Sequence, residues 1–411
     1  MNVPALRFKD DDGQEFPEWE EKTLGELCDV KGGKRIPKGY YLQYESNGLP
    51  YITVTDMYKG GVNSKYIRYV PTEVAELIKN YKITTNDIFI SVAGTLGIVG
   101  IIPKELNNAN LTENANKLTN LRCHQHYLLQ YLMSDRLVNL IDNVQTVGAQ
   151  PKLAIYALNR FEVSIPSLPE QTKIANFLTA IDEKIAQLTQ KGKLLTQYKK
   201  GVMQQIFSQE FRFKDDDGQE FPEWEEKMLG EVSDRVIRKN KEDNKNVLTI
   251  SAQYGLIDQK DYFNKSVSAK ILTNYYLLHL GDFAYNKSYS NGYPMGAIKC
   301  LNRYEKGVVS TLYICFKFKD SFLNKFFEQY FEAGLQNQEI EKVAQEGARN
   351  HGLLNIGLDD FFSIRLTVPS LPEQTKIANF LTAIDEKITN NQTQLDAVKQ
   401  YKQGLLQQMF V

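Results

Sequence analysis

The chain has 411 residues, of which 42% are hydrophobic and 11% aromatic, enough to fill the cores of two or three domains. A formal net charge of −1 excludes a uniformly basic protein, and no run of about eighteen apolar residues is present to span a membrane. We therefore expect a soluble cytoplasmic protein, whose cysteines Cys28, Cys123, Cys300 and Cys315 are free buried thiols rather than disulfides.

The segment RFKDDDGQEFPEWEEK occurs at residues 7–22 and again, unchanged, at 212–227. Its aspartates suggest a calcium loop, but with Gly13 at the invariant sixth position the first and twelfth ligand positions fall on Phe8 and Trp19, which cannot bind the ion. We interpret Phe16, Pro17 and Trp19 instead as apolar anchors that tie the end of one helix to the start of the next domain.

A basic segment follows each acidic repeat. Residues 31–104 hold ten Lys or Arg against five Asp or Glu, and residues 235–306 hold twelve against six. Because local patches rather than total charge set the field that a polyanion meets, this alternation is compatible with a nucleic-acid partner. Scattered solvated charge is the alternative interpretation.

The segment PSLPEQTKIANFLTAIDEKI occurs at 166–185 and again at 369–388, and each copy predicts the start of a long helix. Ser167 and Glu170 have the spacing of a capping box. Downstream, apolar residues recur at alternating spacings of three and four, with Gly192 as an interruption, which is the pattern of a coiled-coil seam. The seam residues are Ile174, Leu178, Ile181, Ile185, Leu188, Leu195, Val202 and Ile206, then Ile377, Leu381, Ile384, Ile388, Leu395, Val398, Leu405 and Met409.

Two such helices of about 40 residues would each be about 60 Å long. Since one amphipathic helix cannot bury its own seam, we expect the two to pack antiparallel around a pseudo-two-fold axis. The alternative is that each folds back on its own domain. The predicted fold is α+β: a first globular domain over residues 1–165, a helix over 166–208, a second globular domain over 209–368 and a second helix over 369–411, with two mixed α/β domains separated by the coiled coil.

Signatures of catalysis are missing from the sequence. It contains no GxxxxGK[ST] phosphate loop, no GxSxG elbow, no HExxH motif, and no (Asn/Asp)-Pro-Pro-aromatic motif of an amino-methyltransferase. Cys123, His124 and His126 are metal-ligand types, but they lead into an amphipathic helix without a second ligand pair. The sequence therefore predicts a binding protein rather than an enzyme, with no catalytic residue, metal site or cofactor of its own.

The whole chain resembles the specificity (DNA-recognition) subunit of type I restriction-modification systems. The resemblance depends on VGAQPKLAIYALNRFEVSIPSLPEQTKIANFLTAIDEKI at 147–185 and its counterpart at 346–388, and on FPEWEEKTLGE at the entrance of the first domain. It also depends on KGGKRIPKGYY and GLPYITVTDM in the first variable region and on GDFAYNKSYSNGYPMGAIK in the second.

The resemblance implies that each variable region reads one half of a gapped site in double-stranded DNA. It further implies that the helices set the gap and dock two modification (methyltransferase) subunits, which carry S-adenosylmethionine and methylate adenine N6, and that restriction (motor-nuclease) subunits join for cleavage. A four-residue insertion after Gln190 is then expected to widen the gap without altering either half-site. The alternative function is a symmetric scaffold whose variable domains bind protein or RNA.

Loops rich in Gly, Lys and Arg are the expected DNA contacts, because phosphate contacts position a reader and base-edge contacts specify sequence. For any one of these residues, a solvated surface position is the alternative. The candidates in the first region are Lys31, Lys34, Arg35, Lys38, Thr95, Gln150 and Lys152. Those in the second region are Lys287, Ser290, Asn291, Tyr293, Arg349, Asn350 and His351.

Overall fold

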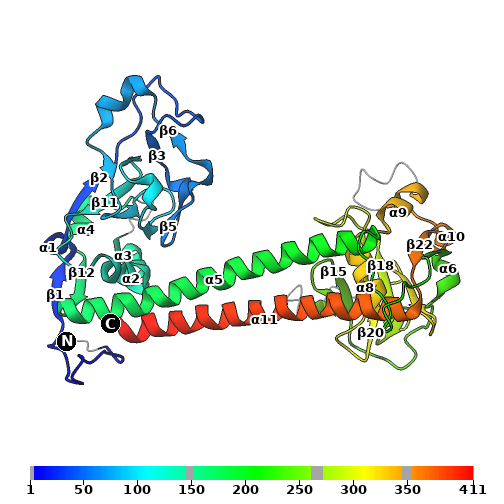
Figure 1. The fold of residues 1–411 in the computed structure, drawn as a ribbon. Coiled ribbons are helices and arrows are strands. Elements are labelled where there is room, and N and C mark those ends of the chain that lie inside the picture. Colours follow the sequence, from blue (N-terminus) through cyan, green and yellow to red (C-terminus); the bar gives the residue numbers. More distant parts are fainter. Residues whose placement is uncertain (1–3, 145–151, 261–271, 345–353, 411) are drawn as a thin grey trace. The chain divides into compact units, whose positions relative to one another are not determined.

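The structure, a computed structural model, describes residues 4–144, 152–260, 272–344 and 354–410 (Figure 1). The chain divides into two compact units: unit 1 comprises residues 1–190 and 393–411, and unit 2 comprises residues 191–392. Each unit contains one variable region and a part of each of the two long helices, α5 (Leu168–Phe207) and α11 (Leu371–Met409).

Unit 1 is built on short antiparallel strands. β1 (Glu20–Thr23) pairs with β12 (Glu162–Ile165), and a four-stranded sheet has the order β2 (Asp29–Gly32), β11 (Ala115–Thr119), β8 (Ile88–Ser91), β9 (Val99–Gly100). A second sheet has the order β6 (Arg68–Tyr69), β3 (Pro50–Ile52), β10 (Ala109–Leu111), β7 (Lys82–Ile83), and β4 (Met57–Tyr58) pairs with β5 (Gly61–Val62). The helices are α1 (Leu24–Leu27), α2 (Gln125–Met133), α3 (Asp135–Val144) and α4 (Ile155–Asn159), with 3-10 turns at Val54–Asp56, Ser64–Tyr66, Thr72–Ile78 and Lys104–Leu106.

Unit 2 repeats this plan. β13 (Glu225–Met228) pairs with β22 (Arg365–Val368), and the four-stranded sheet has the order β14 (Ser233–Arg235), β21 (Ile314–Phe318), β18 (Phe283–Asn286), β19 (Ala297–Cys300). Two further pairs are β15 (Leu248–Ser251) with β16 (Gly255–Asp258), and β17 (Tyr276–His279) with β20 (Lys306–Val309). The described helices are α6 (Leu229–Val232), α8 (Asn324–Glu332), α9 (Asn337–Val343) and α10 (Leu358–Phe362). Each variable region therefore has its own four-stranded sheet with the same strand order, although the two sequences are almost unrelated.

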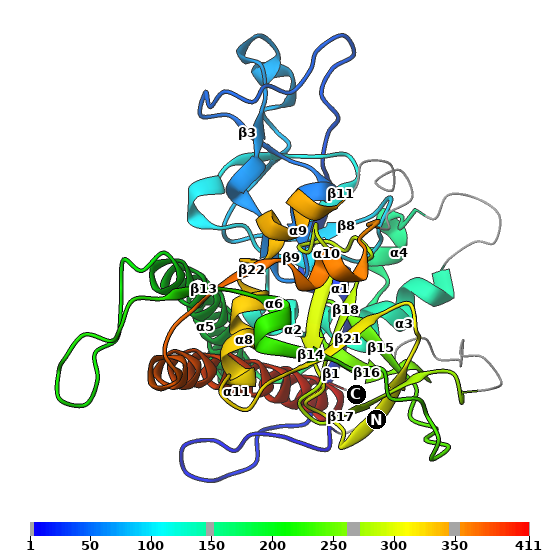
Figure 2. The ribbon, with the colours of Figure 1, turned by 90° about the vertical axis from the view of Figure 1, so that its right-hand side faces the viewer.

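The long helices pack on each other in both units, and they run antiparallel. In unit 1, Ile174 and Leu178 of α5 lie in one apolar core with Leu405 and Met409 of α11. In unit 2, the core contains Met203 and Ile206 of α5 together with Ile377 and Leu381 of α11. Figures 1 and 2 show the two helices side by side. The predicted fold class, mixed α/β domains with an antiparallel pair of long helices, is confirmed, and the alternative of helices that pack only on their own domains is wrong.

All sixteen predicted seam residues are buried or half-buried. At the ends of the helices the seam joins the domain cores, because α2 and α8 pack their apolar faces against it. The helix pair and the variable domains thus share one core within each unit, which fixes each domain firmly on the helices.

In each unit, the acidic repeat and the repeat at the start of the long helix meet at a buried ion pair. In unit 1 the guanidinium of Arg7 donates to both carboxylate oxygens of Glu170 (3.1 and 2.8 Å), and Trp19 Nε1 donates to the same carboxylate (3.1 Å). In unit 2, Arg212, Glu373 and Trp224 make the same three bonds. Both glutamates are fully buried. The acidic segment is therefore anchored by its arginine and tryptophan, which agrees with an anchoring role for Trp19.

The capping box predicted at Ser167 is not formed. Ser167 Oγ is buried without a hydrogen-bond partner, and Glu170 is instead bound to Arg7 and Trp19. A charged donor such as the Arg7 guanidinium forms a stronger hydrogen bond than the backbone amide that a capping box uses, so Glu170 binds Arg7 instead of capping the helix. The spacing of the sequence could not reveal this competitor.

The aspartates of the repeat form a tight turn. Asp10 Oδ1 accepts from the backbone N–H of Asp12 (3.0 Å) and of Gln14 (2.7 Å), and Gly13 has φ +77°, a conformation that favours glycine. Asp11 binds Lys173 of α5 at 2.6 Å. The carboxylates are used for the turn and the helix contact, and among the described residues no group of three or more ligands suited to a metal ion occurs.

The end of α11 lies beside the start of the chain. The backbone N–H of Leu6 donates to the carbonyl of Gln408 at 3.2 Å, and in unit 2 the N–H of Phe211 donates to the carbonyl of Gln205 at 3.0 Å. The two contacts are equivalent, because Leu6 and Phe211 each directly precede an acidic repeat, and Gln408 and Gln205 lie at matching positions of the long helices.

This equivalence predicts that the chain tolerates circular permutation. A protein in which residue 411 is joined to residue 1 by a short linker, and which begins after Gln209, is expected to fold with an unchanged circular dichroism spectrum and thermal transition, since exposed junctions accept new termini. A permutant opened within β8 at Phe89, which is fully buried, is the control and should be insoluble. An insoluble protein from the opening after Gln209 would contradict the equivalence.

Unit 2 contains a half-buried carboxyl group, that of Glu328 on α8. Burial raises the pKa of Glu328, although Asn302 Nδ2 donates to its Oε2 at 2.6 Å. A carboxyl group whose pKa is higher in the folded state favours folding when protonated, and this contribution is lost as the pH rises through the folded pKa. Glu328→Gln is neutral at every pH, so we expect it to raise the melting temperature at pH 8 and to give a smaller gain at pH 5. Thermal unfolding at both pH values tests this; an equal effect at both, or the same profile for the exposed control Glu386→Gln, would contradict it.

Candidate nucleic-acid interface

The basic segment after β2 lies along the connection between β10 and β11. Gly33 permits this close approach, because a Cβ added there would lie 2.0 Å from the carbonyl oxygen of Thr112. Lys34 follows, with its Nζ 5.7 Å from the centre of the Tyr81 ring. Arg35 pairs with Glu113 at 2.5 Å while 77% of its side chain remains exposed. Each cation is held by one neighbour but keeps exposed donors for a phosphate.

Two further candidates in this segment are exposed. Lys31, on β2, lies 4.0 Å from Asp29 and has 57% of its side chain exposed. Lys38 lies in the loop beyond Arg35 and is also exposed. Exposed ion pairs of this kind are weak, so Lys31 could exchange Asp29 for another anion at little cost.

Lys152 is far from Thr95 in sequence but lies on a segment that pairs with the start of the turn of Thr95. Thr95 is exposed in the turn between β8 and β9, where Gly94 and Gly97 have φ near +78° and +76°. The Ser91 hydroxyl fixes this turn by donating to the carbonyl of Thr95 at 2.6 Å. The segment that contains Lys152 runs beside it, with a bridge between Ala93 and Lys152. Of this group, Gln150 lies outside the described residues.

The loop between β18 and β19 is the counterpart in unit 2. Ser290 and Tyr293 close a turn that exposes Asn291, and the carbonyl of Lys287 accepts from the N–H of Leu354 at 3.1 Å. In unit 1 the corresponding bond runs from Leu153 N–H to the carbonyl of Val92 at 3.0 Å. Arg349, Asn350 and His351 lie outside the described residues. The same loop position thus carries different residues in the two units.

The hydroxyl of Tyr293 is hydrogen-bonded to both Glu332 and Lys299. Its hydroxyl donates to Glu332 Oε1 at 2.6 Å, and Lys299 lies 4.6 Å from its ring centre and pairs with Glu332 at 2.6 Å. Burial and this carboxylate raise the pKa of Tyr293. A hydroxyl committed to a charged acceptor is poorly placed for base contact, so Tyr293 supports the loop.

The sequence interpretation missed the exposed aromatic residues of unit 1. Tyr41 and Tyr44 are each 84% exposed and follow Lys38 in the same loop. Tyr44 and Tyr66, together with Arg68, line a polar cavity of about 310 Å³. Large exposed tyrosines among cations are typical of surfaces that bind nucleic acid or protein, and the run GYYLQYES was the available signal.

The remaining candidate groups do not form a reactive site. The four cysteines are free, as predicted, and burial raises the pKa of Cys28 to about 12 and that of Cys123 to about 11, so neither is a reactive thiolate. Burial lowers the pKa of His124, which favours its neutral form. None of the described helices has the length and apolar character needed to cross a membrane.

The comparisons with known proteins agree with this architecture. A family model described as "Type I restriction modification DNA specificity domain" matches residues 17–197 and 222–400. The specificity subunit of the type I restriction enzyme MjaVIII from Methanocaldococcus jannaschii is 24% identical, over 97% of this chain and 94% of that protein. The putative MjaX specificity subunit of the same organism is 23% identical, over 97% of this chain and 94% of that protein.

Two solved structures share the fold at low sequence identity. The S subunit of a type I restriction-modification system from M. genitalium has a TM-score of 0.59 and 17% identity, over 100% of this chain and 99% of that one. A chain from a structure of type I restriction-modification complex assembly has a TM-score of 0.54 and 15% identity, over 96% and 98% of the two chains. With both halves of the sequence matched by the family model, this chain belongs to the specificity subunits of type I restriction-modification systems.

Proposed function

We propose that this chain reads a two-part, gapped site in double-stranded DNA, with one variable domain on each half-site. The observation that carries the proposal is the equivalence of the β8–β9 and β18–β19 loops, which occupy the same place on the shared sheet and differ in sequence. A shared scaffold with unlike loops suits the reading of two unlike words by one mode of docking.

We further propose that the chain docks two modification subunits and catalyses nothing itself. The two units present the same helix contacts, which supports two equivalent docking positions. S-adenosylmethionine and adenine N6 methylation would belong to those partners, and restriction subunits would join the same assembly. No residue of this chain is assigned to the chemistry.

The test is to map methylated adenines in a host that expresses this chain with its modification partner. Thr95→Ala is expected to relax one half-site by about 1–3 kcal/mol and to leave the other unchanged, while Asn291→Ala does the reverse. Thr189→Ala and Asn390→Ala, the same changes at exposed positions of α5 and α11, are the controls. If all four variants give the parental methylation pattern, the loops are not the readers.

A symmetric scaffold that binds protein or RNA is the competing function, and salt dependence separates the two. If phosphate neutralisation drives binding, the affinity of the purified complex for duplex DNA falls steeply between about 50 and 200 mM salt. Absence of duplex binding at either salt concentration would favour the scaffold.

A further inference from the structure

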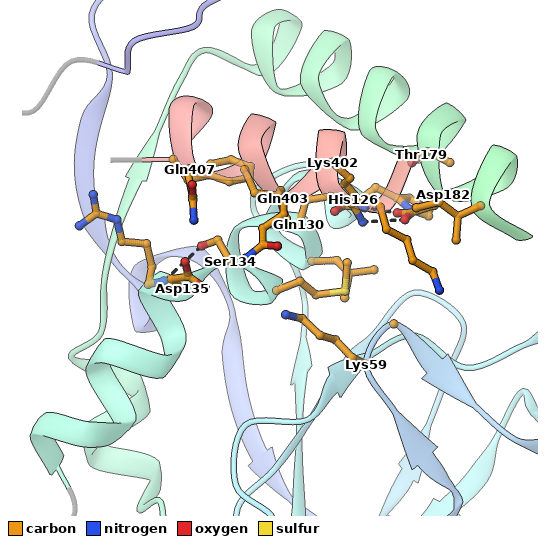
Figure 3. A pocket seen from close by; sticks show the side chains of 18 of the residues that line it. Lys59, His126, Gln130, Ser134, Asp135, Thr179, Asp182, Lys402, Gln403 and Gln407 are labelled. Atoms are coloured by element: carbon orange, nitrogen blue, oxygen red, sulfur yellow. Dashed lines mark hydrogen bonds and ion pairs between the residues drawn. The ribbon is translucent and has the colours of Figure 1, made fainter. Parts of the chain in front are cut away.

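One polar cluster in unit 1 connects three helices. Lys402 Nζ of α11 donates to Asp182 Oδ1 of α5 at 2.6 Å, and Gln130 Nε2 of α2 donates to Asp182 Oδ2 at 2.7 Å. Lys402 and Gln130 are both buried, and Figure 3 shows the three side chains meeting at the wall of a cavity. Asp182 therefore binds the other long helix and the variable domain at the same time.

Unit 2 has the same cluster with the two long helices exchanged. Lys199 of α5 binds both oxygens of Asp385 of α11, at 2.6 and 2.8 Å, and Gln329 of α8 donates to Asp385 at 2.9 Å. The aspartates and lysines occupy matching positions of the two helices, seventeen residues apart in each, from 182 to 199 and from 385 to 402.

The glutamines lie in the variable regions, where the two halves otherwise differ. Each is followed by a tyrosine that also makes a matching contact: Tyr131 accepts from the N–H of Ser164 at 3.3 Å, and Tyr330 accepts from the N–H of Thr367 at 3.4 Å. The glutamine thus attaches two unlike domains to the same helix position, and the tyrosine binds the strand that precedes that helix.

Both lysines lie at seam positions, where the spacing of three and four residues would otherwise place an apolar side chain. Lys199 lies between the seam positions Leu195 and Val202, and Lys402 lies between Val398 and Leu405. A polar residue at a seam position costs stability and specifies register and partner, because only one arrangement gives it a partner.

The identical repeats alone do not decide the direction of packing. In a parallel, in-register pair, Lys199 would face Lys402 across the seam. Seventeen residues earlier, Asp182 and Asp385 would lie level with each other, so each like-charged pair would come together. In the antiparallel pair each lysine reaches an aspartate. A slip of one heptad would place Lys402 opposite Ala175 or Thr189, neither of which is acidic.

We infer that the Asp182–Lys402 and Asp385–Lys199 pairs set the direction and register of the helix pair, and that Gln130 and Gln329 fasten each variable domain to that register. These are positioning residues: they would determine where each reading domain is held, and so they act on recognition without contacting DNA. The consequence for recognition rests on the proposed function, whereas the register itself does not.

The test exchanges the charges within one helix. Asp182→Lys combined with Lys199→Asp keeps the composition of α5. In unit 1 the new lysine at 182 then faces Lys402, and in unit 2 the new aspartate at 199 faces Asp385. Adding Asp385→Lys and Lys402→Asp restores opposite charges in both units. Glu183→Lys with Lys200→Glu is the matched control, since it makes a similar exchange at the same spacing on exposed positions one residue further along.

Register is measured by a disulfide across the seam. A Cβ at Gly192 would lie 2.9 Å from Asn391 Nδ2, so Gly192→Cys with Asn391→Cys is expected to cross-link on oxidation. In this background we expect the two-residue exchange to slow cross-linking about tenfold and to lower the melting temperature by about 5–10 °C. The four-residue exchange should recover both values. Parental cross-linking and melting in the two-residue exchange would overturn the inference.

The fastening role has its own readout. Gln130→Leu should leave the cross-linking rate unchanged and weaken methylation of the recognised sites, because the first variable domain is held less firmly on the helices. Gln190→Leu, at an exposed position of α5, is the control. Unchanged methylation would overturn the fastening role. A cross-linking result as expected, together with a complex that binds no duplex DNA, would retain the register inference and reject the proposed function.

Discussion

Replacing Glu170 by alanine is expected to lower the free energy of unfolding of unit 1 by about 3 kcal/mol. Glu170 is fully buried, and its loss leaves the guanidinium of Arg7 and the indole N–H of Trp19 without their acceptor. An uncompensated buried donor carries its full desolvation cost, and for a charged group this is larger than the net value of the pair.

The measurement uses the two tryptophans of the chain, one in each unit. In a Trp224→Phe background, the fluorescence of Trp19 reports urea unfolding of unit 1 alone. Glu183→Ala, at an exposed position on the same helix, is the control and should change stability by less than about 0.5 kcal/mol. Glu373→Ala should affect unit 2 as Glu170→Ala affects unit 1. Equal stability of the Glu170→Ala and Glu183→Ala variants would show that the ion pair contributes nothing.

If the chain reads a gapped site, as proposed, lengthening both long helices together is expected to widen the gap. Insertion of seven residues after Gln190 and seven after Gln392 adds about 10.5 Å to each helix, equivalent to about three base pairs. Both insertion points coincide with the boundary between the units, so every contact inside each unit is preserved. Seven residues also keep the seam facing the partner helix. Methylated sites should show unchanged half-sites and a gap longer by about three base pairs.

A seven-residue insertion in α5 alone is the control for the paired design. It cannot satisfy the Lys402–Asp182 contact of unit 1 and the Lys199–Asp385 contact of unit 2 at once, because α11 keeps its length. The four-residue insertion after Gln190 expected from the sequence meets the same obstacle. We expect the single insertion to reduce stability, and a paired insertion that changes the half-sites but leaves the gap unaltered would refute the helices as a spacer.

The helical frame was predictable because its signal is periodic and repeated. Eight apolar positions in each of two copies, at spacings of three, four or their sum, indicated two long helices that share a seam, and the structure has helices over Leu168–Phe207 and Leu371–Met409. Lys199 and Lys402 are the polar positions on that seam. Their partners, Asp385 and Asp182 respectively, lie on the other helix and could be identified only once the helices were paired.

The candidate interface was predictable only as a set of loops. Glycine-rich basic segments indicated Lys34, Arg35 and Thr95, but no local pattern shows that Lys152 lies beside the turn of Thr95, because that neighbour is brought in by a strand-like pairing of distant segments. The same limit applies to Tyr293, whose hydroxyl is occupied by Glu332, thirty-nine residues away.

By itself, the sequence determined the duplicated frame, the two long helices and the family, because identical repeats and seam periodicity are local properties of the chain. Only the tertiary structure decided that Glu170 serves as a buried partner of Arg7 rather than as a cap, and that the two unlike variable regions share one sheet order. The reason is physical: the partner of a buried charge or of a strand is chosen by long-range packing, which brings together residues that no spacing along the chain connects.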